Sequence, residues 1–185
     1  MTDVEDLNLV QHARTLPSSL MADDGLRELF STIAKPVAVL GYLTIDARPH
    51  GLTIGSLTGV SLDPPLILFS IARAMRRYSA VRHASRYCFS LLAEDQDDVG
   101  QKYARSSTSG FEGPVEFRGD LPGVPAAAAW FVGSQVGWFE AGDHTVVVVH
   151  VEDGARSARL PLLYYRRKYR GLRETIPVGG ILGCL

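Results

Sequence analysis

The sequence is poor in cysteine, with only Cys88 and Cys184 among its 185 residues. These two positions lack the spacing of metal ligands, and no group of His, Cys, Asp and Glu elsewhere in the sequence has it, so we predict no metal site. Cys88 lies in an apolar run that predicts a strand. We therefore expect a reduced, structural thiol at this position rather than a disulfide.

An excess of basic charge is also absent, because 19 Lys and Arg residues face 20 Asp and Glu residues. Such a chain has no overall positive field, which argues against a sequence-independent nucleic-acid binder. No apolar run approaches the roughly 20 residues that cross a bilayer. The first residues, MTDVEDLNLV, are acidic and polar where a signal peptide has a basic start and an apolar centre. We expect a cytoplasmic protein without nucleic-acid or membrane partners.

Two enzyme fingerprints are missing as well. No G-x-G-x-x-G follows the first predicted strand, and strands do not alternate regularly with helices, which argues against a doubly wound dinucleotide-binding fold. No G-x-S-x-G is present, so we do not predict the nucleophile elbow of a serine hydrolase.

What the sequence does contain is enough apolar residues, 46% of the chain, for the core of one ordinary domain. We expect an N-terminal arm at 1–22, the domain at 23–173 and a C-terminal tail at 174–185. Within the domain, apolar spacing and acidic helix starts predict an amphipathic helix from Asp23 and two shorter helical segments at 78–85 and 94–106.

About six or seven strands are predicted between these helices. Apolar runs bounded by Gly, Pro and Asp mark them at 37–46, from 50 onward, 65–72, 86–92, 126–142, 144–153 and 160–165. Many strands, frequent turn residues and few helices predict a mainly β protein, an antiparallel barrel with helices at its margins. The apolar run of Val146 to Val149 with Val151 suggests a strand covered by the barrel core on one face and by a helix or a second subunit on the other, which hints at a homodimer.

Four short motifs occur together in this chain. They are GLTIGSLTGVSLDPP at 51–65, FSLLAEDQDDVGQKYA at 89–104 with Phe111 beyond it, AGDH at 141–144, and PLLYYRRKYRGL at 161–172. In this order and spacing the sequence resembles the flavin reductase family, over about residues 23–173. The resemblance implies the FMN-binding split barrel, an antiparallel Greek-key fold, and a role beside two-component flavin monooxygenases.

The first motif is the expected cofactor segment. Small hydroxyl residues and glycines let backbone amides approach a ligand while offering donors and acceptors of their own. The resemblance implies that Thr53, Ile54, Ser56 and Leu57 contact the flavin. The alternative is that Ser and Thr only suit a strand edge.

A flavin phosphate needs positive charge or clustered N–H donors. Arg77 is the first candidate and Arg73 the second, and the alternative is a solvated basic face or ion pairs with the acidic helix near Asp95. The sequence departs from the family at Ser90, where an asparagine usually contacts the flavin, and at Val149, where a glycine is usual. Ser90 is kept as a cofactor contact on this resemblance.

Further roles are implied by the resemblance alone. His144 is the candidate for orienting the nicotinamide, although a lone histidine after Gly-Asp is more often a turn residue. Phe111 is expected beside the flavin, Tyr169 beside the nicotinamide, and Arg166 near a dinucleotide phosphate.

The resulting hypothesis is an NAD(P)H-dependent flavin reductase that transfers hydride to FMN, or FAD, and supplies a partner monooxygenase. The alternatives are a split-barrel enzyme that keeps its flavin and acts on a small metabolite, and a non-catalytic module that binds flavin or haem. The choice between FMN and FAD, and between NADH and NADPH, is not written in the sequence, because no dinucleotide fingerprint is present.

Overall fold

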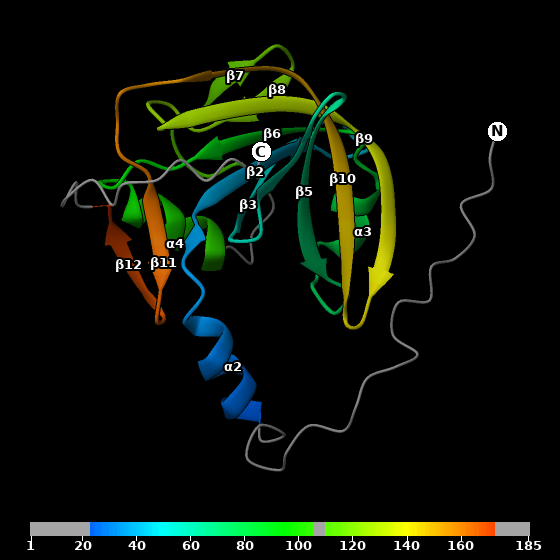
Figure 1. Ribbon diagram of the computed structural model, residues 1–185. Coiled ribbons are helices and arrows are strands. Elements are labelled where there is room, and N and C mark those ends of the chain that lie inside the picture. Colours follow the sequence, from blue (N-terminus) through cyan, green and yellow to red (C-terminus); the bar gives the residue numbers. More distant parts are fainter. Residues whose placement is uncertain (1–22, 106–109, 173–185) are drawn as a thin grey trace.

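A computed structural model describes residues 23–105 and 110–172 (Figure 1). Its three helices are α2 (Asp23–Ser31), α3 (Tyr78–His83) and α4 (Asp97–Arg105). The twelve strands of the described residues are β1 (Lys35–Pro36), β2 (Ala38–Leu43), β3 (Pro49–Ile54), β4 (Thr58–Leu62), β5 (Pro65–Ala72), β6 (Arg86–Leu91), β7 (Glu116–Arg118), β8 (Leu121–Gly123), β9 (Ala129–Ala141), β10 (His144–Arg156), β11 (Leu162–Tyr165) and β12 (Lys168–Gly171).

A seven-stranded antiparallel sheet forms the main body, in the order β3-β2-β6-β9-β10-β5-β4. Its two edge strands, β3 and β4, are consecutive in the chain and are joined by only Gly55, Ser56 and Leu57. Three residues span at most about 11 Å, so the sheet must curl until its edges approach one another. The predicted mainly β, antiparallel fold is confirmed, with the edges joined by a loop rather than by a strand ladder.

Alternating side chains fill the inside of the curled sheet. Along β5, Ile67, Phe69 and Ile71 are buried, and the residues between them are only half-buried. Phe69 meets Tyr87 and Phe89 edge to face, with ring centroids 5.3 and 5.4 Å apart. This is the period-two pattern of a strand with one face on a core.

A second layer covers the other face of β2. Val37 and Val39 pack there with Leu92, Tyr103 and Leu162, beneath α4 and the small β1-β11-β12 sheet. Because β2 is covered on both faces, five of its six residues are buried. Because β2 is packed against α4, it fixes the position of its neighbour β3, and of the residues that follow β3, relative to that helix.

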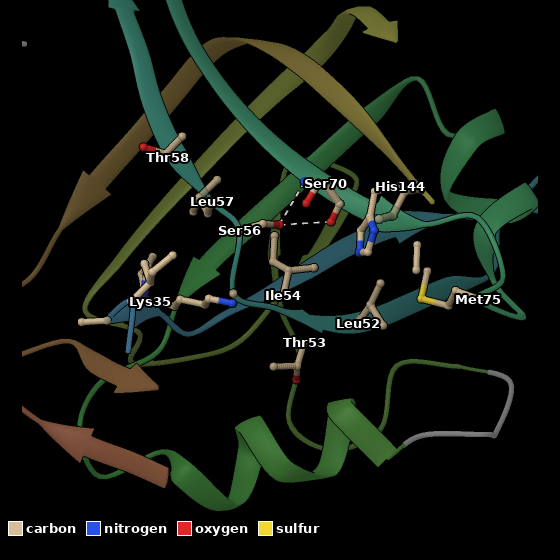
Figure 2. A pocket seen from close by; sticks show the side chains of 16 residues that line it. Lys35, Leu52, Thr53, Ile54, Ser56, Leu57, Thr58, Ser70, Met75 and His144 are labelled. Atoms are coloured by element: carbon tan, nitrogen blue, oxygen red, sulfur yellow. Dashed lines mark hydrogen bonds between the residues drawn. The ribbon is translucent and has the colours of Figure 1, made fainter. Parts of the chain in front are cut away.

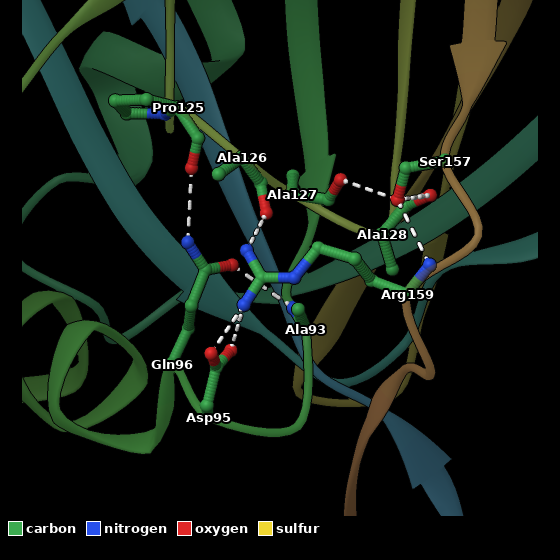
Figure 3. Close-up of polar contacts among 9 residues, drawn as sticks. All are labelled: Ala93, Asp95, Gln96, Pro125, Ala126, Ala127, Ala128, Ser157 and Arg159. Carbon is green, nitrogen blue, oxygen red and sulfur yellow. Dashed lines mark hydrogen bonds and ion pairs between the residues drawn. The ribbon is translucent and has the colours of Figure 1, made fainter.

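A polar cluster joins three loops at one end of the domain (Figure 3). The guanidinium of Arg159 pairs with Asp95 and donates to the carbonyl of Ala126. The Ser157 hydroxyl donates to the carbonyls of Ala127 and Ala128. Ala126 has a left-handed backbone, φ 53°, which is uncommon for a residue with a Cβ, and Arg159 helps to hold its carbonyl in place.

The valine run of β10 has two different faces. Val147 and Val149 point into the core and are fully buried, whereas Val146 and Val148 face outward and are half-buried. Within this chain the barrel core fully covers one face of the strand, and cover of the other face by a second subunit stays a prediction. Val149 closes against Gly133 of β9, where an added Cβ would lie 2.8 Å from Val149 Cγ1.

The predicted elements and the predicted state of Cys88 can be compared with the structure, whereas the predicted arm and most of the tail cannot. The predicted helices and strands are all found, but β1, β4, β7, β8 and β12 were not predicted as separate strands. Cys88 is a buried free thiol, as expected, and burial raises its pKa to about 11. The expected arm and most of the expected tail lie outside the described residues.

Candidate functional site

A pocket of about 550 Å³ lies beside the short connection between β3 and β4. Figure 2 shows Lys35 at one end of it, Met75 and His144 at the other, and Ile54 and Ser56 between them. Its lining also comprises Ile33, Ala34, Pro36, Leu52, Thr53, Gly55, Leu57, Thr58, Ser70, Ile71 and Ala72. The pocket thus has an apolar middle and a titratable or cationic side chain at each end.

Ser56 fixes the wall of this pocket. Its hydroxyl accepts a hydrogen bond from the amide of Ser70 at 2.9 Å and donates to the carbonyl of the same residue at 3.0 Å. The β4–β5 ladder stops at Thr58 and Leu68, so the next residue pair toward the pocket is Ser56 with Ser70. One side chain here replaces the two bonds that a backbone pair would make.

His144 begins β10 directly after the turn, and its Cα is paired with that of Ala72. Its Nδ1 lies 2.7 Å from Oδ1 of Asp143, and 43% of its side chain is exposed. The hydrogen bond to His144 and the charge of its ring lower the pKa of Asp143. A carboxylate on Nδ1 favours the proton there, which leaves Nε2 as the nitrogen available to a ligand.

Lys35 is a pocket residue that the sequence did not reveal. It sits in the two-residue strand β1, between α2 and the barrel. An added Cβ on Gly55 would lie 3.6 Å from Cβ and Cδ of Lys35, so the stem of the lysine passes over that glycine. Two residues of strand carry no periodicity that could have marked this position.

Four of the predicted cofactor residues are therefore brought together with His144. Ile54, Ser56 and Leu57 line the pocket, and Thr53 lines it as well. The Thr53 hydroxyl, however, turns toward α4 and donates to the carbonyl of Gly100 at 2.8 Å. Its side chain therefore serves the packing of the helix, and its backbone faces the pocket side.

Ser90 and Phe111 lie elsewhere. Ser90 is buried, and its hydroxyl accepts a hydrogen bond from the amide of Val124 at 2.9 Å, beside β8. Phe111 packs on Tyr103 of α4, with ring centroids 4.9 Å apart. Neither residue lines the pocket in this chain.

The two predicted phosphate residues have protein partners. Arg73 forms an ion pair with Glu140 at 2.8 Å and donates to the carbonyl of Gly142 at 2.6 Å. Arg77 donates to the carbonyl of Gly51 at 2.7 Å. The ion pair expected near Asp95 is instead made by Arg159. Arg73 and Arg77 are not among the residues that line the pocket.

Arg166 lies in the turn between β11 and β12, and Tyr169 lies in β12. The Arg166 amide donates to the carbonyl of Ser31 at the end of α2, at 2.8 Å. Tyr169 packs edge to face on Tyr164, with centroids 5.4 Å apart, and burial raises its pKa. Neither Arg166 nor Tyr169 is among the residues that line the pocket.

Comparison with known proteins bears on this site. Residues 30–173 match the family model described as a flavin reductase like domain. The chain belongs to the flavin reductase family. The predicted family is thus confirmed across the pocket, β10 and the small sheet.

Curated relatives of this flavin reductase family chain cover most of it. It is 34% identical over 157 residues to an NADH:riboflavin 5'-phosphate oxidoreductase of Streptomyces pristinaespiralis, which spans 82% of this chain and 89% of the relative. It is 35% identical over 147 residues to a probable flavin reductase of Rhizobium meliloti, which spans 78% of this chain. That match covers only 47% of the Rhizobium protein, so this chain corresponds to about half of the relative's length.

Solved structures agree with the family. The flavin reductase PheA2 superposes with a TM-score of 0.76 at 27% identity, over 83% of this chain and 100% of PheA2. BorF, the flavin reductase component of a bacterial two-component tryptophan halogenase, superposes with a TM-score of 0.74 at 31% identity, over 82% of this chain and 99% of BorF.

No group of three or more His, Cys, Asp and Glu side chains is arranged to hold a metal ion in residues 23–105 and 110–172. In the same ranges, no helix is long and apolar enough to cross a membrane.

Proposed function

We propose that the protein is an NADH-dependent flavin reductase that binds FMN in the pocket beside Gly55–Leu57. The observation that carries this proposal is the pocket itself, in which Ile54, Ser56, Leu57 and His144 converge from two strands and one loop. Family membership supplies the reaction class, and relatives named as NADH:FMN oxidoreductases from Rhodococcus species support the choice of cofactor and reductant.

The residues present fit such a ligand. Ile54, Leu57 and Met75 offer apolar surface for a flat ring, and the Gly55 backbone is free of a side chain. Ser56 holds the wall against β5, so the surface is formed before a ligand arrives. A bound flavin would supply the ring that accepts hydride from the nicotinamide.

The contribution of the chain is then positioning and exclusion of water. No nucleophile or acid–base pair is required, because binding the two partners in a fixed geometry accounts for the acceleration. We assign His144 to orienting the nicotinamide, since its Nδ1 is engaged by Asp143 and its ring lies at the pocket end opposite Lys35.

Two further features belong to this proposal. The half-buried outward residues of β10, Val146 and Val148, and the exposed Phe139 beside them on β9 form an apolar surface next to His144, which we assign to a homodimer interface. A reductase component of trigonelline monooxygenase from Acinetobacter baylyi is 34% identical, and a flavin monooxygenase is the partner we propose here. Use of the NADH pool points to the cytoplasm.

The decisive experiment mixes purified protein with FMN and NADH and follows the visible flavin absorption without oxygen. Bleaching at a rate that saturates with both substrates supports the proposal. Binding of FMN without bleaching would leave a flavin-binding module, and absence of FMN binding would refute the assignment of the pocket. Yellow colour that survives desalting would indicate an enzyme that retains its flavin.

The dimer is tested separately. Val148→Glu places a charge on the outward face of β10 and should shift the mass in solution, measured by light scattering, to that of one chain. Ile45→Glu, at an exposed position in the turn between β2 and β3, is the comparison variant for the added charge. A single-chain mass for the unmodified protein would exclude the interface.

A further inference from the structure

The turn between β9 and β10 places His144 at the pocket. The two strands are joined by only Gly142 and Asp143, and the Cα of His144 is paired with that of Ala141. Gly142 has a left-handed backbone, φ 62°, as the common two-residue hairpin turns require. Because His144 is the first strand residue after this turn, any movement of the turn moves the imidazole that lines the pocket.

Arg73 is bonded to this turn three times. Its backbone amide donates to the carbonyl of Asp143 at 2.9 Å, and one guanidinium nitrogen donates to the carbonyl of Gly142 at 2.6 Å. The other terminal nitrogen donates to Oε2 of Glu140, in β9, at 2.8 Å. Since Arg73 directly follows β5, this one residue continues the pairing of β5 with β10 and spans the turn to β9.

The contact between Asp143 and His144 depends on the backbone that Arg73 holds. Oδ1 of Asp143 lies 2.7 Å from Nδ1 of His144, and the Asp143 side chain is 92% exposed. Because so little of this side chain is packed against other atoms, the Asp143 backbone sets where its carboxylate lies. Hydrogen bonds behind a functional side chain hold it in its working orientation. Arg73 therefore fixes the turn and, through Asp143, the ring of His144.

The strand behind His144 is anchored from the same segment. Tyr78, which begins α3, shares a hydrogen bond with the hydroxyl of Thr145 at 2.8 Å, and Thr145 is fully buried. Met75 lies between Arg73 and Tyr78 in the chain and lines the pocket beside His144 (Figure 2). The segment from Arg73 to Tyr78 is thus bonded to β10 from the core side and to the turn from outside.

We propose that Arg73 is a positioning residue for the reaction, which holds the Gly142–Asp143 turn so that His144 presents Nε2 to the nicotinamide. This inference rests on the proposed function, in which His144 orients the nicotinamide. Arg73 does not line the pocket, so it acts through the turn and not on the ligand. Its ion pair with Glu140 is partly exposed, and such pairs contribute little to stability. The guanidinium therefore serves the geometry of the site.

Steady-state kinetics and flavin titration test this role in the full chain. Arg73→Met removes the guanidinium, and we expect KM for NADH to rise about three- to tenfold, the effect of one lost hydrogen bond. The FMN dissociation constant should change by less than about twofold, and Tm should fall by no more than about 4 °C. Arg86→Met is the matched control, because Arg86 makes exposed ion pairs with Asp120 and Glu152 outside the pocket. It should leave KM unchanged.

Glu140→Ala distinguishes positioning from direct attraction. If Arg73 attracted the anionic NADH by its charge, removal of Glu140 would strengthen that attraction and lower KM. If Arg73 positions the turn, the loss of Glu140 releases the guanidinium, so KM should rise, but by less than in Arg73→Met. Arg73→Lys should restore KM only in part, because an ammonium lacks the planar fork that reaches Glu140 and Gly142 together.

A double variant shows whether Arg73 acts through His144. Adding Arg73→Met to His144→Ala should raise KM no further, because the side chain that Arg73 positions is already absent. A readout that needs no activity is the imidazole signal of His144 in NMR spectra, assigned by its loss in His144→Ala. Arg73→Met should shift and broaden this signal, and Arg86→Met should leave it unchanged.

Several outcomes would overturn the inference. Additive effects of Arg73→Met and His144→Ala would show that Arg73 acts without the histidine. A loss of FMN affinity as large as the rise in KM would place Arg73 in the flavin site. An unchanged KM and an unchanged His144 signal in Arg73→Met would show that the turn needs no guanidinium. If the unmodified chain oxidises no NADH, the proposed function fails as well, whereas a failure confined to the Arg73 variants removes only the role of Arg73.

Discussion

Ser56→Ala is the substitution for which the structure makes the sharpest statement. The Ser56 hydroxyl makes two hydrogen bonds to the backbone of Ser70, and both groups are part-buried. A hydrogen bond contributes about 0.5–1.5 kcal/mol net, so the loss of two should lower the free energy of unfolding by about 1–3 kcal/mol. For a chain of this size that corresponds to a fall in Tm of roughly 2–12 °C.

The same substitution should weaken FMN binding, because Ser56 holds the pocket wall against β5. We expect the FMN dissociation constant to rise about five- to tenfold. Thermal unfolding, urea unfolding and fluorescence titration measure these effects on one preparation.

A matched control separates the wall from stability in general. Ser157→Ala also removes a hydroxyl that bonds to backbone carbonyls, at the loop cluster of Figure 3. It should lower stability by a similar amount and leave FMN binding unchanged. If Ser56→Ala lowers stability without affecting FMN binding, or if Ser157→Ala weakens FMN binding equally, the assignment of this wall to the cofactor is refuted.

The remaining predictions concern other parts of the molecule. Gly41→Ala would place a Cβ 1.8 Å from the Pro122 carbonyl oxygen, so it should abolish or sharply reduce the yield of folded protein. Gly59→Ala, where an added Cβ has nothing within 4 Å, should fold normally. Equal yields of the two variants would contradict the packing of β2 against β8. Arg159→Met should cost about 1 kcal/mol in urea unfolding, since its ion pair with Asp95 is partly exposed and screened, and an unchanged midpoint would remove the loop cluster from the account of stability. Cys88, whose pKa burial raises to about 11, should resist iodoacetamide at pH 8 until the protein unfolds, as read by peptide mapping; rapid labelling of the folded chain would show that the β8 cover opens. His144→Ala should raise KM for NADH more than the dissociation constant of FMN in stopped-flow and titration measurements, and equal changes would speak against its role with the nicotinamide.

The sequence predicted the long elements because their hydrophobic periodicity is strong. Strands such as β5 alternate clearly, and α4 begins with acids and ends with bases. The sequence did not predict β4 as a separate strand, because this strand has only five residues, TGVSL, and most of them are exposed. β12, with the sequence KYRG, is strongly basic and carries no apolar pattern.

The candidate site was only partly predictable for a different reason. Backbone position follows from strand register, and the predicted residues on or beside these strands do line one pocket. They are Ile54, Ser56, Leu57 and His144. The direction of a long side chain depends on partners that are distant in sequence. Arg73 pairs with Glu140, which is 67 residues away in the sequence, and no local sequence pattern predicts such a pair. Lys35 was missed because its strand is too short to leave a signal.

The short link between the two edge strands limits how this protein can change. Gly55, Ser56 and Leu57 join the two edge strands of the curled sheet and also line the pocket, so a longer loop here would separate the edges and displace the pocket wall together. A larger ligand would have to be accommodated by substitutions on β5, β10 or the stretch before β1. Insertions, by which loops usually diversify, would not be tolerated in this connection.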